Sequence, residues 1–190
     1  MRLALEMLPE NANPKLVARL RNDVEEMNRL IGEFISFSRG LEKEATQLID
    51  LNLLLQELAE NAATEGHEVR VLPHAQCIRP VGPMALRRIL SNLAGNAVRY
   101  GAGKAVEMEC ECAEGASVIR VLDRGPGIPA AEVENVFRPF YRLESSRSVA
   151  TGGSGLGLAI AKQLADVNGW KIELLPRQGG GTEARLTIPD

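Results

Sequence analysis

Residues 92–100 read Asn92-Leu93-Ala94-Gly95-Asn96-Ala97-Val98-Arg99-Tyr100, near the middle of a chain of 190 residues. Pro83 suits the first turn of a helix, so we expect this helix to cover Met84 to Tyr100. Asn92, Asn96 and either Arg99 or Tyr100 share one face, because residues three and four apart are neighbours on a helix. The opposite face is apolar and consists of Leu86, Ile89, Leu90, Leu93 and Ala97. The pattern predicts a helix that packs on a core and presents its asparagines toward a cleft.

A second signal follows an apolar run, Val118 to Leu122, that is typical of a strand. It reads Asp123-Arg124-Gly125-Pro126-Gly127-Ile128. A carboxylate at the end of a strand, followed by two glycines around a proline, indicates a tight turn whose backbone a flat ligand can approach. Such a turn is ordinary on its own, and so is a solvated asparagine on a helix. The signals carry weight in combination.

Two further signals follow along the chain. Phe137-Arg138-Pro139-Phe140 leads into a polar stretch with Arg142 and Arg147, a composition that suits a mobile loop. Gly152-Gly153-Ser154-Gly155-Leu156-Gly157-Leu158 then runs into a helix expected from Gly155 to about Asn168. Glycines that open a helix leave backbone N–H groups free to bind phosphate. Taken singly, the two phenylalanines have even odds of being plain core residues, and a lone glycine-rich loop is weak evidence.

The remaining segments predict the fold class. A helix capped by Asn52 is expected to reach about Thr64, and a short helix is expected near Ala131 to Phe137. Strands are expected at Leu48–Leu51, Glu68–Leu72, Cys77–Val81, Ala105–Cys112, Ser117–Leu122, Trp170–Leu175 and Thr182–Ile188. This order predicts an α+β fold, a two-layer α/β sandwich with a mixed sheet.

The first 39 residues have the pattern of a truncated helical hairpin. Residues 1–8 are helix-like and stop at Pro9, and a long helix is expected from Lys15 to about Arg39. Its apolar residues recur in steps of three and four, at Val17, Leu20, Val24, Met27, Ile31 and Phe34. Such a seam favours a partner helix over the core of its own domain. We therefore expect a partial hairpin at 1–39, a linker at 40–47 and a separate domain at 48–190.

Composition excludes several classes of protein. Hydrophobic residues make up 45% of the chain, yet no apolar stretch approaches the roughly 20 residues of a membrane helix. The net charge of -3 argues against nucleic-acid binding. No secretion signal is visible. The cysteines Cys77, Cys110 and Cys112 are odd in number, and we expect them to be reduced and the chain to be cytoplasmic. The spacing of the last two favours small residues on one sheet face over a zinc site.

Together the four signals resemble the N, G1, F and G2 boxes of the GHKL superfamily, and Gly180-Gly181-Thr182 resembles its last glycine-threonine box. The resemblance is to two-component sensor histidine kinases. Leu3 to Arg39 looks like part of a dimerisation and histidine-phosphotransfer hairpin, and Leu51 to Pro189 looks like the catalytic domain. The wording of Asn92 to Tyr100 and the short lid, the segment between Phe140 and Gly153, look most like porin-regulating osmosensor kinases of the EnvZ type. The resemblance implies the Bergerat ATP-binding fold.

The same resemblance implies the partners. The domain would donate the γ-phosphate of ATP to a histidine on the dimerisation helix, for relay to an aspartate of a response regulator. The full-length kinase would be a homodimer, and this chain would be the cytoplasmic portion of an inner-membrane sensor without membrane or nucleic-acid contacts of its own.

Catalytic roles also follow from the resemblance, for Asn92, Asn96 and Arg99. Asn96 would be the ligand of Mg²⁺, and Asn92 would support the same face. Arg99, or the lid residues Arg142 and Arg147, would contact the phosphates, since guanidinium groups suit phosphate oxygens.

At the other end of the nucleotide, Tyr100 would stack near the adenine and Asp123 would accept a hydrogen bond from its amino group. Guanine presents an oxygen there, so ATP should be preferred. The other expected nucleotide-binding residues are Gly125, Gly127, Ile128, Phe140, Gly153, Ser154, Gly155, Leu156, Gly157, Leu158 and Thr182.

Position 92 separates a kinase from a hydrolase. In the ATP-hydrolysing members of the superfamily a glutamate four residues before the magnesium-binding asparagine is the general base, and here that position is Asn92. An amide cannot take the proton, so general-base help worth roughly 100- to 10,000-fold is missing. This favours transfer to a histidine ring, which needs positioning more than a strong base.

Neither histidine of the chain suits the role of acceptor. His67 is followed by Glu68, as in the family, but on a strand-like run, and His74 beside Pro73 indicates a loop. We expect the acceptor upstream of Met1, and therefore ATP binding without self-phosphorylation or phosphatase activity of this chain alone. Two alternatives stay open, a regulatory nucleotide-binding module and an anti-sigma-type serine kinase of the same fold. The helical seam favours the histidine kinase.

Overall fold

The computed structural model describes residues 44–143 and 154–190, together with Val17, Leu20, Arg21, Val24, Met27 and Gly32. The chain divides into two compact units, Met1–Arg39 and Gly40–Asp190. The six described residues of the first unit are helical. Ile31 and Phe34 of the predicted seam, and the predicted first arm, lie outside the described residues, so the hairpin as a whole stays a prediction.

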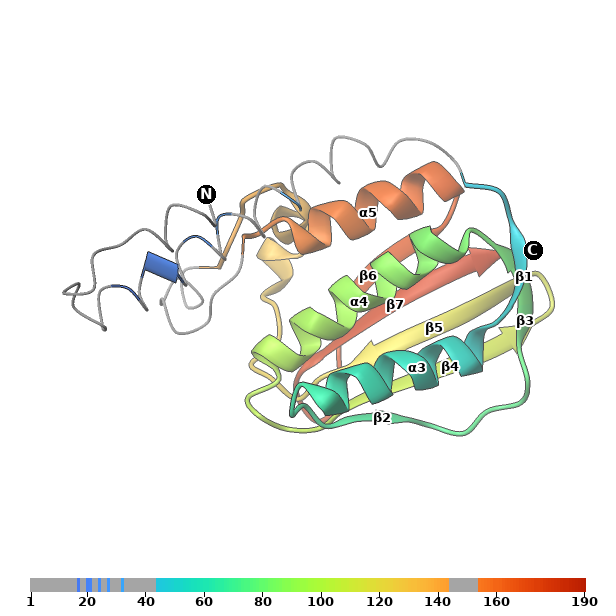
Figure 1. The fold of residues 1–190 in the computed structure, drawn as a ribbon, viewed down its shortest axis with the longest axis horizontal. Coiled ribbons are helices and arrows are strands. Elements are labelled where there is room, and N and C mark those ends of the chain that lie inside the picture. The colour runs from blue at the N-terminus through green and yellow to red at the C-terminus, as the bar shows by residue number, and fades with distance from the viewer. Residues whose placement is uncertain are drawn as a thin grey trace. The chain divides into compact units, whose positions relative to one another are not determined.

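A mixed sheet of five strands forms the base of the second unit, in the order β2-β4-β5-β7-β6 (Figure 1). The strands are β2 (Val69–Val71), β4 (Val106–Ala113), β5 (Ala116–Leu122), β6 (Lys171–Pro176) and β7 (Thr182–Pro189). β2 is parallel to β4, and the other neighbours are antiparallel. One face of the sheet is covered by α3 (Leu51–Thr64), α4 (Pro83–Tyr100) and α5 (Gly157–Asn168) (Figure 1). The predicted fold class, an α+β two-layer sandwich with a mixed sheet, is confirmed.

Alternating burial along the strands separates the side of the sheet that faces the helices from its open side. In β5 Ser117, Ile119 and Val121 are buried and the residues between them are partly exposed. The apolar face of α4 packs against the buried side through its five predicted core residues, Leu86, Ile89, Leu90, Leu93 and Ala97. This packing leaves Asn92 and Asn96 partly exposed.

Two short 3-10 turns, η1 (Ala130–Glu132) and η2 (Asn135–Phe137), lie where the sequence predicted one short helix. Within the part of the chain that the structure describes, no helix is long and apolar enough to cross a membrane.

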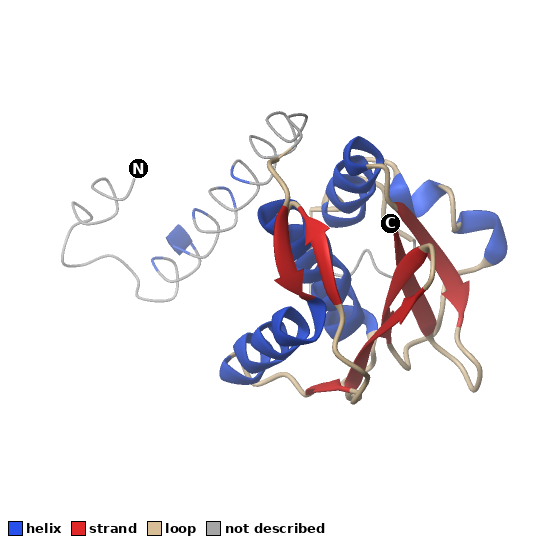
Figure 2. Cartoon of the chain, turned by 90° about the vertical axis from the view of Figure 1, so that its right-hand side faces the viewer, coloured by secondary structure: helices blue, strands red, loops and turns tan. Residues whose placement is uncertain are grey.

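A second sheet of two strands attaches the linker to the segment that precedes α4. β1 (Gln47–Asp50) pairs antiparallel with β3 (Ile78–Val81), and Figure 2 shows the two strands side by side. The strand predicted at Leu48–Leu51 is thus displaced by one residue, because Leu51 already begins α3.

The N-terminus of α3 is capped by Asp50, and not by Asn52 as the sequence predicted. Asp50 Oδ1 accepts hydrogen bonds from the main-chain N–H groups of Asn52 (3.0 Å) and Leu53 (3.3 Å), which the helix itself leaves unpaired. Asn52 instead donates its side-chain amide to the main-chain oxygen of Ala75 at 2.8 Å. The hydrogen bond from Gln76, followed by the main-chain bonds, outweighs burial and holds the pKa of Asp50 below its ordinary value.

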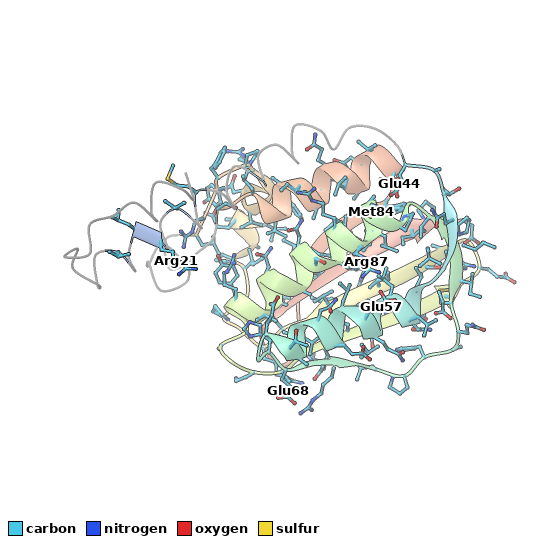
Figure 3. All side chains as sticks on the ribbon, in the orientation of Figure 1. Arg21, Glu44, Glu57, Glu68, Met84 and Arg87 are labelled. Atoms are coloured by element: carbon cyan, nitrogen blue, oxygen red, sulfur yellow. A yellow bond between two sulfur atoms is a disulfide. The ribbon has the colours of Figure 1, made fainter. Side chains whose placement is uncertain are left out.

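The N-terminus of α4 is capped by a residue of the linker. Its own N-cap residue, Gly82, has no side chain to offer, and Glu44 Oε2 accepts the N–H groups of Met84 (2.9 Å) and Ala85 (3.2 Å) instead. Figure 3 shows Glu44 and Met84 together at this end of the helix. A Cβ atom at position 82 would lie 3.0 Å from the same carboxylate oxygen, so glycine makes room for it. The linker is therefore bonded to the helix that carries both asparagines.

The expectation that all cysteines are reduced is wrong for one pair. Cys77 and Cys112 form a disulfide, with Cα atoms 5.7 Å apart. The fold brings the residue before β3 next to β4, a contact across 35 positions that no local pattern reveals. Cys110 is a buried free thiol, and burial raises its pKa to about 11.

Removal of the long-range cap should destabilise the domain. We expect Glu44→Ala to lower the free energy of unfolding by about 0.5–2 kcal/mol, because two N–H groups at the start of α4 lose their acceptor. Glu44→Gln, which keeps an oxygen at the tip, should lose less. Urea unfolding followed by the fluorescence of the single tryptophan, buried Trp170, measures both. Glu60→Ala, at an exposed position of α3, is the control, and an equal effect of Glu60→Ala would contradict the capping role.

Candidate functional site

The segments that the sequence singled out meet along the C-terminal half of α4. Gly157 begins α5 beside Asn92: a Cβ atom on Gly157 would lie 3.3 Å from the side-chain oxygen of Asn92. Gly125 follows β5 and lies at the end of α4, where its Cβ atom would be 2.1 Å from the main-chain oxygen of Tyr100. Asn96 is about one helical turn from each of these contacts. The glycine-rich helix start, the asparagine face and the turn after β5 therefore border one region.

Asp123 is buried at the end of β5, with 7% of its surface exposed. Its Oδ1 atom accepts hydrogen bonds from the main-chain N–H groups of Gly125 (2.7 Å) and Thr182 (3.1 Å). Its own main-chain N–H donates to the main-chain oxygen of Thr182 at 3.0 Å. Among the described residues, no hydrogen bond is found to its other oxygen, Oδ2. One oxygen is thus fixed by the backbone while the second can accept a bond from a ligand.

Glycines surround this carboxylate because other backbone passes too close for a side chain. A Cβ atom on Gly181 would lie 2.2 Å from the main-chain oxygen of Asp123, and Gly181 has a φ of +106°. Gly127 has a φ of +77°, and its Cβ atom would lie 3.3 Å from the main-chain oxygen of Gly181. At Gly101 a Cβ atom would lie 2.5 Å from the main-chain oxygen of Ala97. The sequence singled out Gly127 as a site residue but missed Gly101 and Gly181, although Gly181 stands in the quoted glycine-threonine box.

The asparagine face contains an unusual donor. The side-chain nitrogen of Asn92 is buried and has no hydrogen-bond partner among the described residues. An unpaired buried N–H group costs about 1–3 kcal/mol, so a ligand or water that accepts from it would be stabilised there. Asn96 and Tyr100, about one and two helical turns further along α4, are half-buried, and Arg99 is exposed.

The two ends of the lid are joined by the backbone. The main-chain N–H of Phe140 donates to the main-chain oxygen of Gly155 at 3.0 Å. A Cβ atom on Gly155 would lie 2.8 Å from the backbone of Phe140, so only glycine permits this approach. Phe140 has a φ of +64° and is 63% exposed, which excludes a place in the core. Beyond this junction, Ser154 Oγ accepts the N–H of Leu156 at 3.1 Å.

The structure brings together most of the predicted site residues, with some differences. Leu156 is buried in the core, so only its backbone can face a ligand, and Thr182 contributes its main-chain N–H to Asp123. Arg142 is half-buried at the beginning of the lid, and Leu158 is half-buried at the start of α5. Arg147 and Gly153 lie outside the described residues.

The donor set decides which cation the region can hold. Among the described residues there is no group of three or more His, Cys, Asp or Glu side chains that could bind a metal ion by itself. The amide oxygen of Asn96 can serve as one ligand of a cation that takes its other oxygens from water and phosphate. Mg²⁺ has this preference, because it keeps several waters and is bound with substrate phosphates. The residues present therefore fit a magnesium–phosphate group and do not fit zinc.

The comparisons with known proteins agree with the geometry. The protein family described as "Histidine kinase-, DNA gyrase B-, and HSP90-like ATPase" matches residues 82–190. The sensor histidine kinase GtrS of Pseudomonas aeruginosa is 33% identical over the whole chain, which corresponds to 38% of GtrS. The sensor protein CutS of Streptomyces coelicolor is 40% identical over 71% of this chain and 33% of its own length. The chain thus spans about a third of these relatives.

Solved structures have the same fold. Full-length ShkA in complex with AMPPNP superposes with a TM-score of 0.75 at 25% identity, over 92% of this chain and 38% of ShkA. The Acinetobacter baumannii histidine kinase AdeS superposes with a TM-score of 0.73 at 18% identity, over 94% of this chain and 86% of that one, which supports the fold alone.

Gly181 and Gly179 offer a matched test of the close approach to Asp123. Both have positive φ angles, but a Cβ atom on Gly179 meets nothing within 4 Å. We expect Gly181→Ala to destabilise the domain by about 1–3 kcal/mol more than Gly179→Ala, because its methyl group overlaps the backbone of Asp123. Urea unfolding compares the two variants. Equal losses would mean that backbone conformation, and not the contact, requires the glycine.

Proposed function

We propose that this chain, which belongs to the family of histidine kinase-, DNA gyrase B- and HSP90-like ATPases, transfers the γ-phosphate of ATP to a histidine. Its second unit is the ATP-binding catalytic domain of a sensor histidine kinase. The observation that carries this proposal is the carboxylate of Asp123: two main-chain N–H groups bind one oxygen, and among the described residues no hydrogen bond is found to the other. The finer resemblance of the sequence to EnvZ-type osmosensor kinases is only a loose comparison.

We assign the purine to Asp123. Its Oδ2 atom accepts a hydrogen bond from the amino group of adenine, while the carbonyl oxygen of guanine would meet the carboxylate as acceptor against acceptor. An unpaired acceptor costs about 1–3 kcal/mol, which gives clear preference for ATP. Tyr100 and Ile128, both half-buried, supply apolar contacts to the flat base, and Gly125 and Gly127 let it approach the backbone.

We assign the phosphates and Mg²⁺ to the opposite end of the asparagine face. Asn96 would hold the cation through its amide oxygen, and the side-chain nitrogen of Asn92, which has no partner among the described residues, would donate to a phosphate oxygen. Arg99, or the lid residues Arg142 and Arg147, neutralises phosphate charge. Main-chain N–H groups of the segment that leads into α5 would complete the cradle, from Ser154, Gly155, Gly157 and Leu158. The N–H of Leu156 is already bonded to Ser154 Oγ, and Gly153 lies outside the described residues.

The reaction class follows from Asn92. A carboxamide cannot accept the proton of an attacking water, so the site positions and neutralises the γ-phosphate without activating water. A histidine nitrogen with its lone pair needs no such base. His67 is exposed in the connection from α3 to β2, and His74 lies 3.5 Å from Glu109, neither on a helix.

We therefore assign the acceptor histidine to a dimerisation and phosphotransfer domain of the same kinase. A response regulator would receive the phosphoryl group next. The sensor relatives support this arrangement and a membrane-anchored sensor with a cytoplasmic kinase portion. The described helical residues Leu20 and Met27 of the seam are 39% and 48% exposed, as a dimerisation helix requires before it meets its partner.

Asp123→Asn tests the purine assignment with almost no change of shape. Its amide nitrogen would confront the amino group of adenine, so we expect ATP affinity to fall roughly 5- to 150-fold, the equivalent of 1–3 kcal/mol. Isothermal titration calorimetry with the 190-residue chain measures it. Asp166→Asn, an exposed surface position of α5, is the control. Unchanged affinity of Asp123→Asn would refute the assignment.

Asn96→Ala tests the metal assignment. In the wild type we expect Mg²⁺ to strengthen ATP binding, and in the variant we expect ATP affinity to be nearly the same with Mg²⁺ and with EDTA, because the protein ligand of the cation is gone. Titration of ATP under both conditions gives the result. Asn61→Ala on the exposed side of α3 should keep the wild-type response. A full Mg²⁺ response of Asn96→Ala would place the cation elsewhere.

A further inference from the structure

Arg177, the residue after β6, contacts the backbone of Asp123 from the open side of the sheet. Its Nη1 atom donates a hydrogen bond to the main-chain oxygen of Asp123 at 3.2 Å. Its Nη2 atom donates to the carboxylate of Glu107 on β4, and the two side chains form an ion pair. Only 10% of the arginine side chain is exposed. No sequence motif singled out this residue.

The turn that begins at Arg177 also packs against the peptide that follows Asp123. The main-chain N–H of Arg177 donates to the oxygen of Gly181 at 3.1 Å, and the N–H of Gly180 donates back to the oxygen of Arg177 at 3.1 Å. Gly181 in turn is packed against the backbone of Asp123 and Arg124. Arg177 therefore fixes the peptide after Asp123 both with its side chain and through the turn between β6 and β7.

Glu107 holds the guanidinium in place. Its second oxygen accepts from Arg124 Nη2 at 3.4 Å, so the carboxylate lies between two arginines that flank the Asp123 peptide. Burial alone would raise the pKa of Glu107, but the bonds and charges of Arg177 and then Arg124 outweigh it and hold the pKa below its usual range. Glu107 is thus ionised at neutral pH, which a nearly buried arginine requires.

The geometry of the guanidinium explains why arginine suits this place. Its planar fork directs two donors at fixed angles, here one at a carbonyl and one at a carboxylate. The bond to the carbonyl of Asp123, together with the two N–H groups on Oδ1, restricts the rotation that would turn Oδ2 away. Binding groups that are held in place before the ligand arrives discriminate better than mobile ones.

We propose that Arg177 is a positioning residue for purine recognition, acting through the backbone of Asp123 without touching the nucleotide. This inference rests on the proposed function, in which Asp123 accepts a bond from the adenine amino group. It predicts that the arginine controls the choice of base and leaves the binding of the phosphates to the asparagine face.

The test compares ATP with inosine triphosphate, in which an oxygen replaces the amino group, at a temperature well below the unfolding transition. For Arg177→Gln we expect the preference for ATP over inosine triphosphate to fall on the order of fivefold, with little change for inosine triphosphate. Arg185→Gln is the matched control, because Arg185 is paired with Glu183 on β7 and, among the described residues, forms no hydrogen bond or ion pair with Asp123 or Glu107. Combined with Asp123→Asn, Arg177→Gln should cause no further loss of preference.

Each outcome decides between the proposals. Equal weakening of both nucleotides, or a loss of preference that adds to that of Asp123→Asn, would show a merely structural role and overturn the inference while leaving the proposed function intact. Failure of the wild type to bind ATP would overturn the proposed function itself. Should Arg177→Gln not fold, Glu107→Gln releases the same guanidinium from its carboxylate. It should lower the preference in the same direction, and an unchanged preference would refute the inference.

Discussion

The carboxylate of Asp123 accepts main-chain hydrogen bonds from the turn that follows it and from the start of β7, 59 positions away in the sequence. This pair of bonds ties β5, the glycine turn and the last hairpin into one unit. Buried polar groups must be paired, and within the described part of the chain the backbone pairs only one of the two oxygens. The remaining oxygen is therefore available to a ligand, and the direction in which it points is fixed by the sheet. The glycines at 125 and 181 are consequences of the same constraint, because the backbone segments meet too closely for a Cβ atom.

Helix α4 connects this region to the linker. At its start, the carboxylate of Glu44 provides the cap that Gly82 lacks, and the strand pair β1–β3 holds the linker beside the same end (Figures 2 and 3). At its other end, the helix presents Asn92 and Asn96 and meets the turn after Asp123 at Tyr100. One rigid element thus carries the linker contact, the proposed metal ligand and a wall of the purine site. The linker residue Glu44 is thus in direct hydrogen-bond contact with the helix that carries Asn92 and Asn96.

Several local expectations were wrong for one common reason. Asn52 has the right chemistry for a helix cap, but β1 pairs with β3 and places Asp50 at that point. Cys77 and Cys112 were both expected to be reduced, and only the packing of the loop before β3 on β4 reveals their disulfide. Arg177 stands in an unremarkable stretch, and its contact with Asp123 spans 54 positions. In each case the decisive neighbour is distant in sequence, so spacing and propensity contain no information about it.

The sequence by itself predicted the two-layer fold and the packed face of α4, and it singled out Asn92, Asn96, Asp123 and the glycine-rich segment before α5 as the candidate site. These features depend on periodicity and on short motifs, which are local properties of the chain. Only the tertiary structure decided which oxygen of Asp123 is free, which backbone fixes it, and which distant residues, Glu44 and Arg177, hold the elements of the site in place. Those depend on hydrogen-bond geometry between segments far apart along the chain, and that geometry exists only once the sheet and its helices have packed together.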